Sequence, residues 1–139
     1  MKHYTRTLSL FLFISFAFTQ TQLGSDIDGE AANDFFGNSV SMNSAGDRVA
    51  IGAFFNDGTG TQAGHVRVYE YSNSSWSQLG SDIDGEAVND HSGFSVSMDS
   101  AADRVALGAY NNDVTGHNAG HVRDYEYSNS SWTQLGSNI

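Results

Sequence analysis

An internal repeat constrains this chain more than any other feature of its sequence. Two units, 22–77 and 78–133, align without a gap and have the same residue at three quarters of their positions. Residues 134–139 repeat the start of the unit once more. A fixed period of this size is typical of repeat architectures, in which neighbouring units bury each other's apolar surface. We therefore expect two copies of one small structural unit and part of a third.

Each unit has the pattern of four short strands. In the first unit, strand chemistry covers residues 39–43, 48–54, 65–71 and 76–83, with a turn at 44–47 and a glycine-rich loop at 56–64. β-Branched and aromatic residues favour strands, and no segment in the repeats has the helical period. We predict an all-β fold made of two four-stranded antiparallel blades of a β-propeller-like repeat. Complete propellers have about 4–8 blades, so two form an incomplete propeller.

Three short segments in each unit resemble a known family. In the first unit they are Phe36-Gly37, residues 51–54 (IGAF) and residues 64–69 (GHVRVY), and in the second unit residues 92–93, 107–110 and 120–125. Their order and spacing resemble the FG-GAP repeat, the integrin-α-like propeller blade, in the variant found in secreted bacterial and algal proteins. The resemblance implies a propeller fold whose partners bind at one end of the blades.

The sequence departs from that family at its usual calcium loop. The connection between the first two strands is only residues 44–47, and residues 100–103 in the second unit, which is too short to supply six or more oxygen ligands. We therefore expect no cofactor and no metal. Calcium at the DIDGE stretches is the alternative, although their glycine is at the fourth position and not the sixth. The candidate ligands would be Asp26, Asp28, Asp82 and Asp84.

Acidic residues gather in the segments that the topology brings together. In a four-stranded meander, the loop between the second and third strands lies at the same end as the connection between units. We predict an acidic face there for a cation, a cationic partner or a glycan, with solubility as the alternative reason for the charge. Its residues are Asp26, Asp28, Glu30, Asp34, Asp57, Asp82, Asp84, Glu86, Asp90 and Asp113.

Composition and motifs exclude several classes of function. The chain has 16 acidic against 6 basic residues and a net charge of −10, which argues against nucleic-acid binding. It has no cysteine, so it has neither a disulfide framework nor a thiolate metal site. The sequence has no G-x-S-x-G nucleophile elbow, no H-E-x-x-H zinc-protease motif and no phosphate-binding P-loop. We therefore expect that the chain is not an enzyme.

The first residues have the pattern of a secretory signal peptide. Lys2 and Arg6 precede an uncharged apolar run at residues 8–18, which is shorter than the ~20 residues of a membrane span. We predict a signal peptide at 1–19, followed by the repeat region at 20–139. The mature protein would be secreted, extracellular or periplasmic, without a membrane partner.

These observations predict a secreted, non-catalytic binding or adhesion module, alone or as a fragment of a larger propeller, with an unidentified protein or glycan ligand. The alternative is a structural spacer or truncated repeat segment without a ligand. We also expect self-association or further blades, because two blade faces lack a neighbour. Some of their apolar residues must then face water, among Val49, Ile51, Val66, Val105 and Leu107.

Single positions add three expectations. Phe35-Phe36 is replaced by His91-Ser92 in the second unit, which indicates a surface site. Trp76 and Trp132 are interpreted as packing anchors, and His65 and His121 as residues packed at the start of a strand. The replacement of Val68 by Asp124 has no functional explanation at this level.

Overall fold

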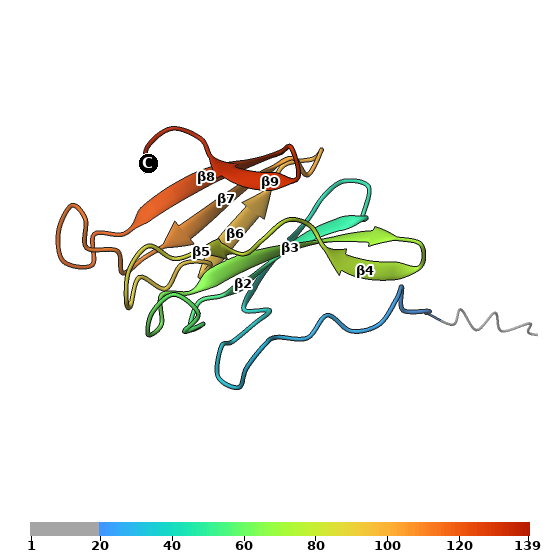
Figure 1. Cartoon of the computed structure of the whole chain (residues 1–139), viewed down its shortest axis with the longest axis horizontal. Coiled ribbons are helices and arrows are strands. Elements are labelled where there is room, and N and C mark those ends of the chain that lie inside the picture. The colour runs from blue at the N-terminus through green and yellow to red at the C-terminus, as the bar shows by residue number, and fades with distance from the viewer. Residues whose placement is uncertain (1–19) are drawn as a thin grey trace, which may run out of the picture.

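The computed structural model describes residues 20–139, and the predicted signal peptide lies outside the described residues. Within this range the protein consists of two antiparallel sheets and no helix (Figure 1). Blade 1 contains β1 (Ser39–Met42), β2 (Arg48–Ala53), β3 (His65–Ser72) and β4 (Ser75–Gln78). Blade 2 contains β6 (Ser95–Met98), β7 (Arg104–Ala109), β8 (His121–Ser128) and β9 (Ser131–Gln134). Each blade is a meander in chain order, so the predicted two four-stranded blades are confirmed.

One strand prediction was wrong in its extent. The segment expected to be a single strand over 76–83 ends at Gln78, because the chain turns at Gly80, whose φ is +77°. It then returns as β5 (Ile83–Asp84), which pairs with the start of β3. In blade 2, Ile139 exchanges two backbone hydrogen bonds with Val122 in the same way. The first residues of the second unit and of the partial third repeat therefore extend the sheet of the preceding blade.

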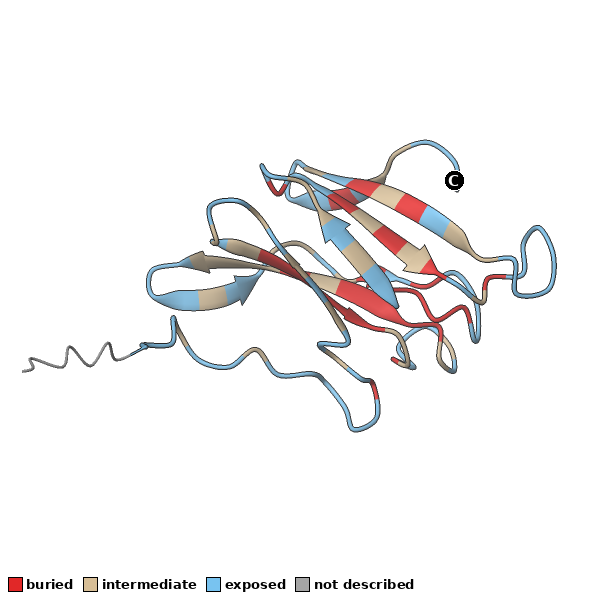
Figure 2. Ribbon diagram, turned by 180° about the vertical axis from the view of Figure 1, so that it is seen from behind, coloured by how far each residue is buried: buried red, intermediate tan, exposed pale blue. Residues whose placement is uncertain are grey.

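The two blades pack face to face, and the core lies between them (Figure 2). Strand β1 lies beside β6, and β2 also contacts β6. Both sheets contribute to one buried cluster, so each repeat completes the core of the other. Its members are Ala50, Val66, Val68, Ile83, Val105, Leu107, Tyr125 and Trp132.

One close approach between the blades requires a glycine. A Cβ atom at Gly52 in β2 would lie 2.0 Å from the carbonyl oxygen of Gly93, which precedes β6. The hydroxyl of Ser39 donates a hydrogen bond to that same oxygen at 2.7 Å. The glycine in the RVAIGA strand therefore permits backbone contact across the interface.

The second face of blade 1 is covered, which corrects the expectation for the five apolar strand residues named above. The segment 22–36 runs along this face (Figure 1). The ring of Phe36 packs edge-on against Tyr69, and the indole of Trp76 donates a hydrogen bond to the carbonyl oxygen of Leu23. The five apolar residues expected in part to face water are all buried: Val49, Ile51, Val66, Val105 and Leu107. Other apolar strand residues do face water, since Val40, Met42 and Val122 are 57%, 52% and 40% exposed, so self-association remains a prediction.

The surface prediction for the Phe35-Phe36 position holds for one unit and is wrong for the other. Phe35 is 54% exposed, whereas His91 and Ser92 are 7% and 0% exposed. The backbone N–H of Ser92 donates to the carbonyl oxygen of Ala63, in the loop of blade 1. Blade 2 has a neighbour on this side and blade 1 does not, so the same position is buried only in the second unit.

Among residues 20–139, no helix is long and apolar enough to cross a bilayer.

Candidate functional site

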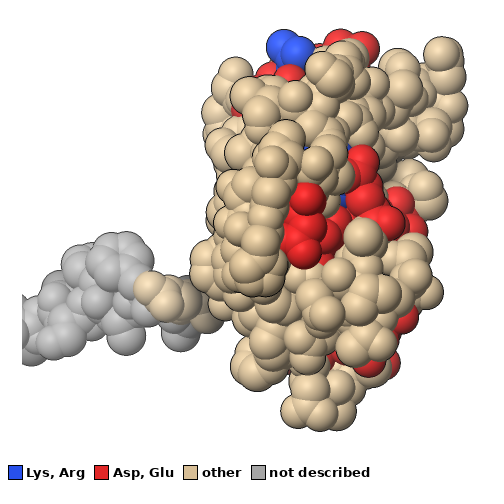
Figure 3. Space-filling model, turned by 90° about the vertical axis from the view of Figure 1, so that its left-hand side faces the viewer, with Lys and Arg blue, Asp and Glu red and all other residues tan. Residues whose placement is uncertain are grey.

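The structure brings the acidic loops to one end of the two blades, as the strand order predicted. This loop end contains the β2–β3 and β7–β8 loops and the connections 26–36 and 82–92. The backbone N–H of Asn89 donates to the carbonyl oxygen of Thr61, and the hydroxyl of Thr59 donates to that of Gly85. Acidic side chains gather across the middle of the face in Figure 3, which views the molecule from the side where these loops lie in Figure 1.

Two of the ten predicted site residues hold this end together. Asp34 and Asp90 are only 6% and 3% exposed. Each carboxylate accepts a hydrogen bond from the side-chain amide of an asparagine, Asn56 at 2.7 Å and Asn112 at 2.8 Å. A buried carboxylate with such a partner fixes the connection that precedes each blade against a loop of that same blade. These two residues are therefore structural and are not available to a ligand.

The other acidic residues retain more contact with solvent. Asp57 and Asp113 are exposed at the loop tips, where each accepts a backbone hydrogen bond from its own loop, from Gln62 and Asn118 respectively. Asp82 is half-buried. The remaining members are exposed: Asp26, Asp28, Glu30, Asp84 and Glu86.

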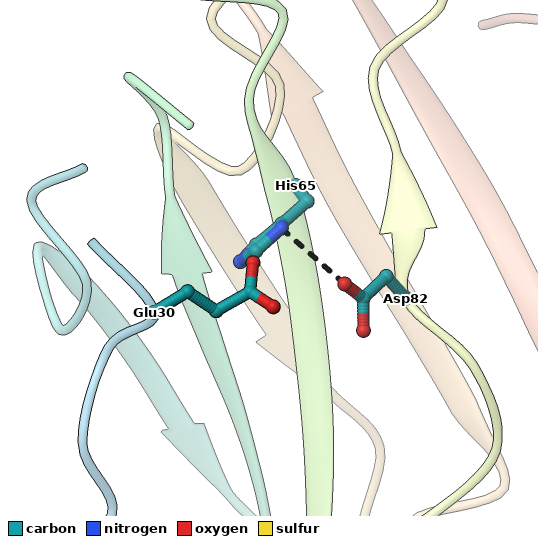
Figure 4. Close-up of side chains that lie close together, drawn as sticks. All are labelled: Glu30, His65 and Asp82. Atoms are coloured by element: carbon teal, nitrogen blue, oxygen red, sulfur yellow. Dashed lines mark ion pairs between the residues drawn. The ribbon is translucent and has the colours of Figure 1, made fainter. Parts of the chain in front are cut away.

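Glu30, His65 and Asp82 form one cluster at this end (Figure 4). Their ligand atoms all lie within 4.8 Å of one another, as in a metal site. The guanidinium of Arg67, however, donates two hydrogen bonds of 2.8 Å to Asp82 and forms an ion pair with Glu30. The arginine therefore already supplies the positive charge that both carboxylates require.

The pKa shifts in this cluster agree with an internal ion network. The hydrogen bond with Asp82 raises the pKa of Arg67 above its usual value. Burial works to raise the pKa of Asp82, but hydrogen bonds from Arg67 and Gln78 outweigh it and lower that pKa. Burial lowers the pKa of His65, although Asp82 opposes the change. A metal ion would have to displace Arg67, so these residues do not fit an open metal site.

The counterpart in blade 2 carries less charge. Asn138 stands where the first blade has Asp82, and its amide lies 3.0 Å from the imidazole of His121. Arg123 is 3.8 Å from Glu86 and donates to the carbonyl oxygen of Asp84 at 2.7 Å. Sequence reasoning placed both histidines at strand starts but did not find these arginine contacts, because the partners are far apart in the chain.

Sequence reasoning missed an aromatic patch at the loop end. Neighbouring ring centroids lie between 4.3 and 5.9 Å apart, and the 5.3 Å contact of Phe54 with Phe94 joins the two blades. Phe35, Phe94 and Tyr110 are 54%, 45% and 46% exposed. The members of the aromatic patch are Phe35, Phe54, Phe55, His91, Phe94 and Tyr110.

The aromatic patch adjoins the acidic loops. Phe55 lines a cavity of about 160 Å³ together with Asp34 and Asp57. The pairs Phe35-Phe36 and Phe54-Phe55 were visible in the sequence, but Phe94 replaces an asparagine of the first unit. Only the packing of the blades brings these residues together.

Two packed four-stranded meanders in tandem, with their connecting loops at one end, define a propeller-type repeat module. Residues 25–69 match the family model of the FG-GAP repeat. The match covers most of the first unit and supports the FG-GAP repeat that its motifs indicated, and the second unit has the same strands and three quarters of the same residues. A search of curated proteins found no match.

Both tryptophans pack as predicted. Trp76 lies against Tyr71 and Trp132 against Tyr127, with ring centroids 5.2 and 5.0 Å apart. The indole N–H of Trp132 donates to the carbonyl oxygen of Leu79 at the end of blade 1. Trp132 therefore lies at the interface between the blades and Trp76 against the segment 22–36.

Proposed function

We propose that this protein is a secreted, non-catalytic binding module that holds a protein partner at its loop end. The observation that carries the proposal is the aromatic patch, which crosses both blades and is exposed beside the acidic loops. The sequence pattern of the predicted signal peptide supports secretion. Mass spectrometry of the exported protein tests that part, and the new amino terminus should lie between Ala17 and Gln22.

The exposed rings favour a binding role because the fold does not need their outer surfaces. Phe35, Phe94 and Tyr110 each leave about half of their surface in water, whereas the blade core is closed. Contiguous exposed apolar surface marks interaction sites in soluble proteins. Aromatic residues are also enriched where interfaces derive most of their binding energy.

The surroundings of the patch favour a partner segment with basic and apolar side chains. The exposed carboxylates of Asp57 and Asp113 lie at the tips of the same loops, and the chain carries a net charge of −10. Ring faces and carboxylates both attract arginine and lysine. Adjacent rings are tilted or edge-on, such as Phe54 against Phe94 at 86°, so they do not form a flat platform for a sugar. The first alternative to a protein partner is a glycan ligand, and the second is a structural spacer that binds no ligand.

A displayed library of short random peptides tests the proposal. Purified residues 20–139 are the bait, and the triple variant Phe35→Ala/Phe94→Ala/Tyr110→Ala is the comparison. The matched control is Leu23→Ala/Met42→Ala, because these two residues are 59% and 52% exposed but lie outside the aromatic patch. We expect enrichment of peptides with basic and aromatic residues by the wild type and the control, with at least a tenfold loss of affinity in the triple variant.

Binding measured at different ionic strengths and on a glycan array distinguishes a protein partner from the two alternatives. Binding through the acidic loops should weaken as ionic strength rises, because salt screens exposed charges. Equal enrichment by the wild type and the triple variant would contradict the proposal. Binding on a glycan array without peptide enrichment would favour the glycan alternative, and binding in neither experiment would favour the spacer.

A further inference from the structure

The two units differ sharply at one position of the third strand. Val68 in β3 pairs with Ala50, and Asp124 in β8 pairs with Ala106, so the two residues occupy the same place in their blades. Val68 is 1% exposed in the core between the blades. Asp124 faces away from blade 1, on the outer face of blade 2, where its side chain is 26% exposed. The second unit thus carries a carboxylate where the first has a core residue.

The outer face of blade 2 is the counterpart of the face by which blade 1 holds blade 2. In blade 1, the hydroxyl of Ser41 accepts a hydrogen bond from the backbone N–H of Met98, and Arg48 donates one to the carbonyl oxygen of Ala102. In blade 2, the matching residues line an open cavity of about 240 Å³. They are Ser97, Arg104, Ala106 and Asp124, joined by Met98 and Asp99.

Asp124 also changes the contacts of the arginine beside it. Arg48 forms its ion pair with Glu70 at 2.6 Å, which leaves one guanidinium nitrogen to reach Ala102 of the next blade. Arg104 forms its ion pair with Asp124 instead, at 3.1 Å. Arg48 thus links blade 1 to blade 2. Its counterpart Arg104 is instead held by Asp124 on the surface of its own sheet.

We infer that Asp124 closes the outer face of blade 2 against the packing of a further blade of this repeat. A blade packed there as blade 2 packs on blade 1 would bury the Asp124 carboxylate in the apolar position of Val68. Burying the Asp124–Arg104 ion pair would remove the hydration of both charges, a cost that often exceeds their mutual attraction. In water the pair with Arg104 keeps its hydration. The inference opposes self-association through this face, and it does not depend on the proposed function of the loop end.

The oligomeric state of the mature chain tests the inference. Sedimentation velocity over a range of concentrations measures the self-association constants of the wild type and of each variant. Asp124→Val and Asp124→Ala both remove the carboxylate, and we expect at least a tenfold increase in the self-association constant for Asp124→Val and a smaller increase for Asp124→Ala. Asp124→Asn, which keeps a polar group, should remain close to the wild type.

The reciprocal substitution provides the matched control. Val68→Asp places the same carboxylate in the interface that is already formed, so its melting temperature should fall clearly below that of the wild type. A wild type that associates as strongly as both Asp124→Val and Asp124→Ala would overturn the inference. An unchanged melting temperature for Val68→Asp would also overturn it, because the interface would then tolerate the charge.

Discussion

Blades 1 and 2 have almost the same sequence but different surroundings. Their strands begin and end at equivalent positions of the repeat, so local sequence sets the same meander twice. Blade 1 lies between the segment 22–36 and blade 2, whereas the outer face of blade 2 is open (Figure 1). Val66 is fully buried and its counterpart Val122 is 40% exposed. The comparison shows that a repeat specifies strands, while its neighbours decide which of its faces becomes core.

Several differences between the units match this change of surroundings. Phe36 packs on Tyr69, where blade 1 has no blade before it. Its counterpart Ser92 is fully buried and accepts a hydrogen bond from Arg123 at 3.2 Å. A large ring covers the face without a neighbouring blade, and a small hydroxyl fits where a neighbour is present.

The largest difference in stability is expected between alanine substitutions at Gly52 and Gly108, which occupy the same position in β2 and β7. Gly52→Ala places a Cβ atom 2.0 Å from a backbone oxygen of the other blade, whereas Gly108→Ala meets only the side chain of Ser95. We expect Gly52→Ala to cost about 3 kcal/mol and lower the melting temperature by roughly 10 °C, and Gly108→Ala to cost much less. Thermal melts by circular dichroism measure both. Equal losses would show that the blades do not pack as described.

A smaller effect should distinguish the two tryptophans. Trp132 is 9% exposed and donates its hydrogen bond to Leu79 between the blades, whereas Trp76 donates to Leu23 at a more exposed site. Trp132→Phe leaves a part-buried carbonyl oxygen without its donor and should cost about 1 kcal/mol. Trp76→Phe should cost less, because water replaces the lost donor. Urea unfolding of the two variants compares them, and a larger loss for Trp76→Phe would contradict the assignment of the interface.

A still smaller effect concerns pH. Burial lowers the pKa of His91 below its usual 6.5, although Asp90 opposes the shift. Between the lowered pKa and 6.5 the unfolded chain binds more protons, so the stability present above 6.5 is lost as pH falls through this window. Removing this one titrating group by His91→Gln should reduce the drop in melting temperature between about pH 7.5 and pH 5.5.

The equivalent position of blade 1 supplies the control. Phe35 is half exposed, so the imidazole introduced by Phe35→His should titrate near its ordinary pKa and add little pH dependence. A pH dependence that is the same in wild type and His91→Gln would contradict the assignment.

The smallest effect is expected from calcium. Arg67 already pairs with both carboxylates of the Glu30–His65–Asp82 cluster. A ligand that binds the native state raises stability by mass action, so melting curves with millimolar Ca²⁺ and with chelator should nearly coincide. Asp82→Asn, which copies Asn138 of the second blade, should leave this result unchanged. A rise of many degrees in the wild type would instead assign Asp82 and its neighbours as ligands.

Much of the fold was predictable because strand chemistry and turns are local. The four strands of each unit and the gathering of the acidic loops at one end both follow from pattern and strand order. The prediction failed at residues 79–83, where the chain leaves its own hairpin to pair with β3. It also failed at His91 and Ser92, whose burial depends on the loop of blade 1.

The candidate site was also predictable only in part. The acidic residues were found from the sequence because they are contiguous, but their roles were not. Asp34 is a buried hydrogen-bond acceptor and Asp82 an arginine partner, and neither role follows from spacing along the chain. The aromatic patch was not found, since Phe35, Phe54 and Phe94 belong to three segments that meet only when the blades pack.

The sequence by itself determined the repeat, the FG-GAP motifs of the first unit and the strand order, because these depend on residues within a single repeat unit. Only the tertiary structure decided which copy of each residue is buried, since that depends on what lies against the blade. Val68 and Asp124 show the physical reason. The same strand position excludes water in one blade and meets it in the other, so an apolar side chain is stabilised at the first and a charged one is tolerated at the second.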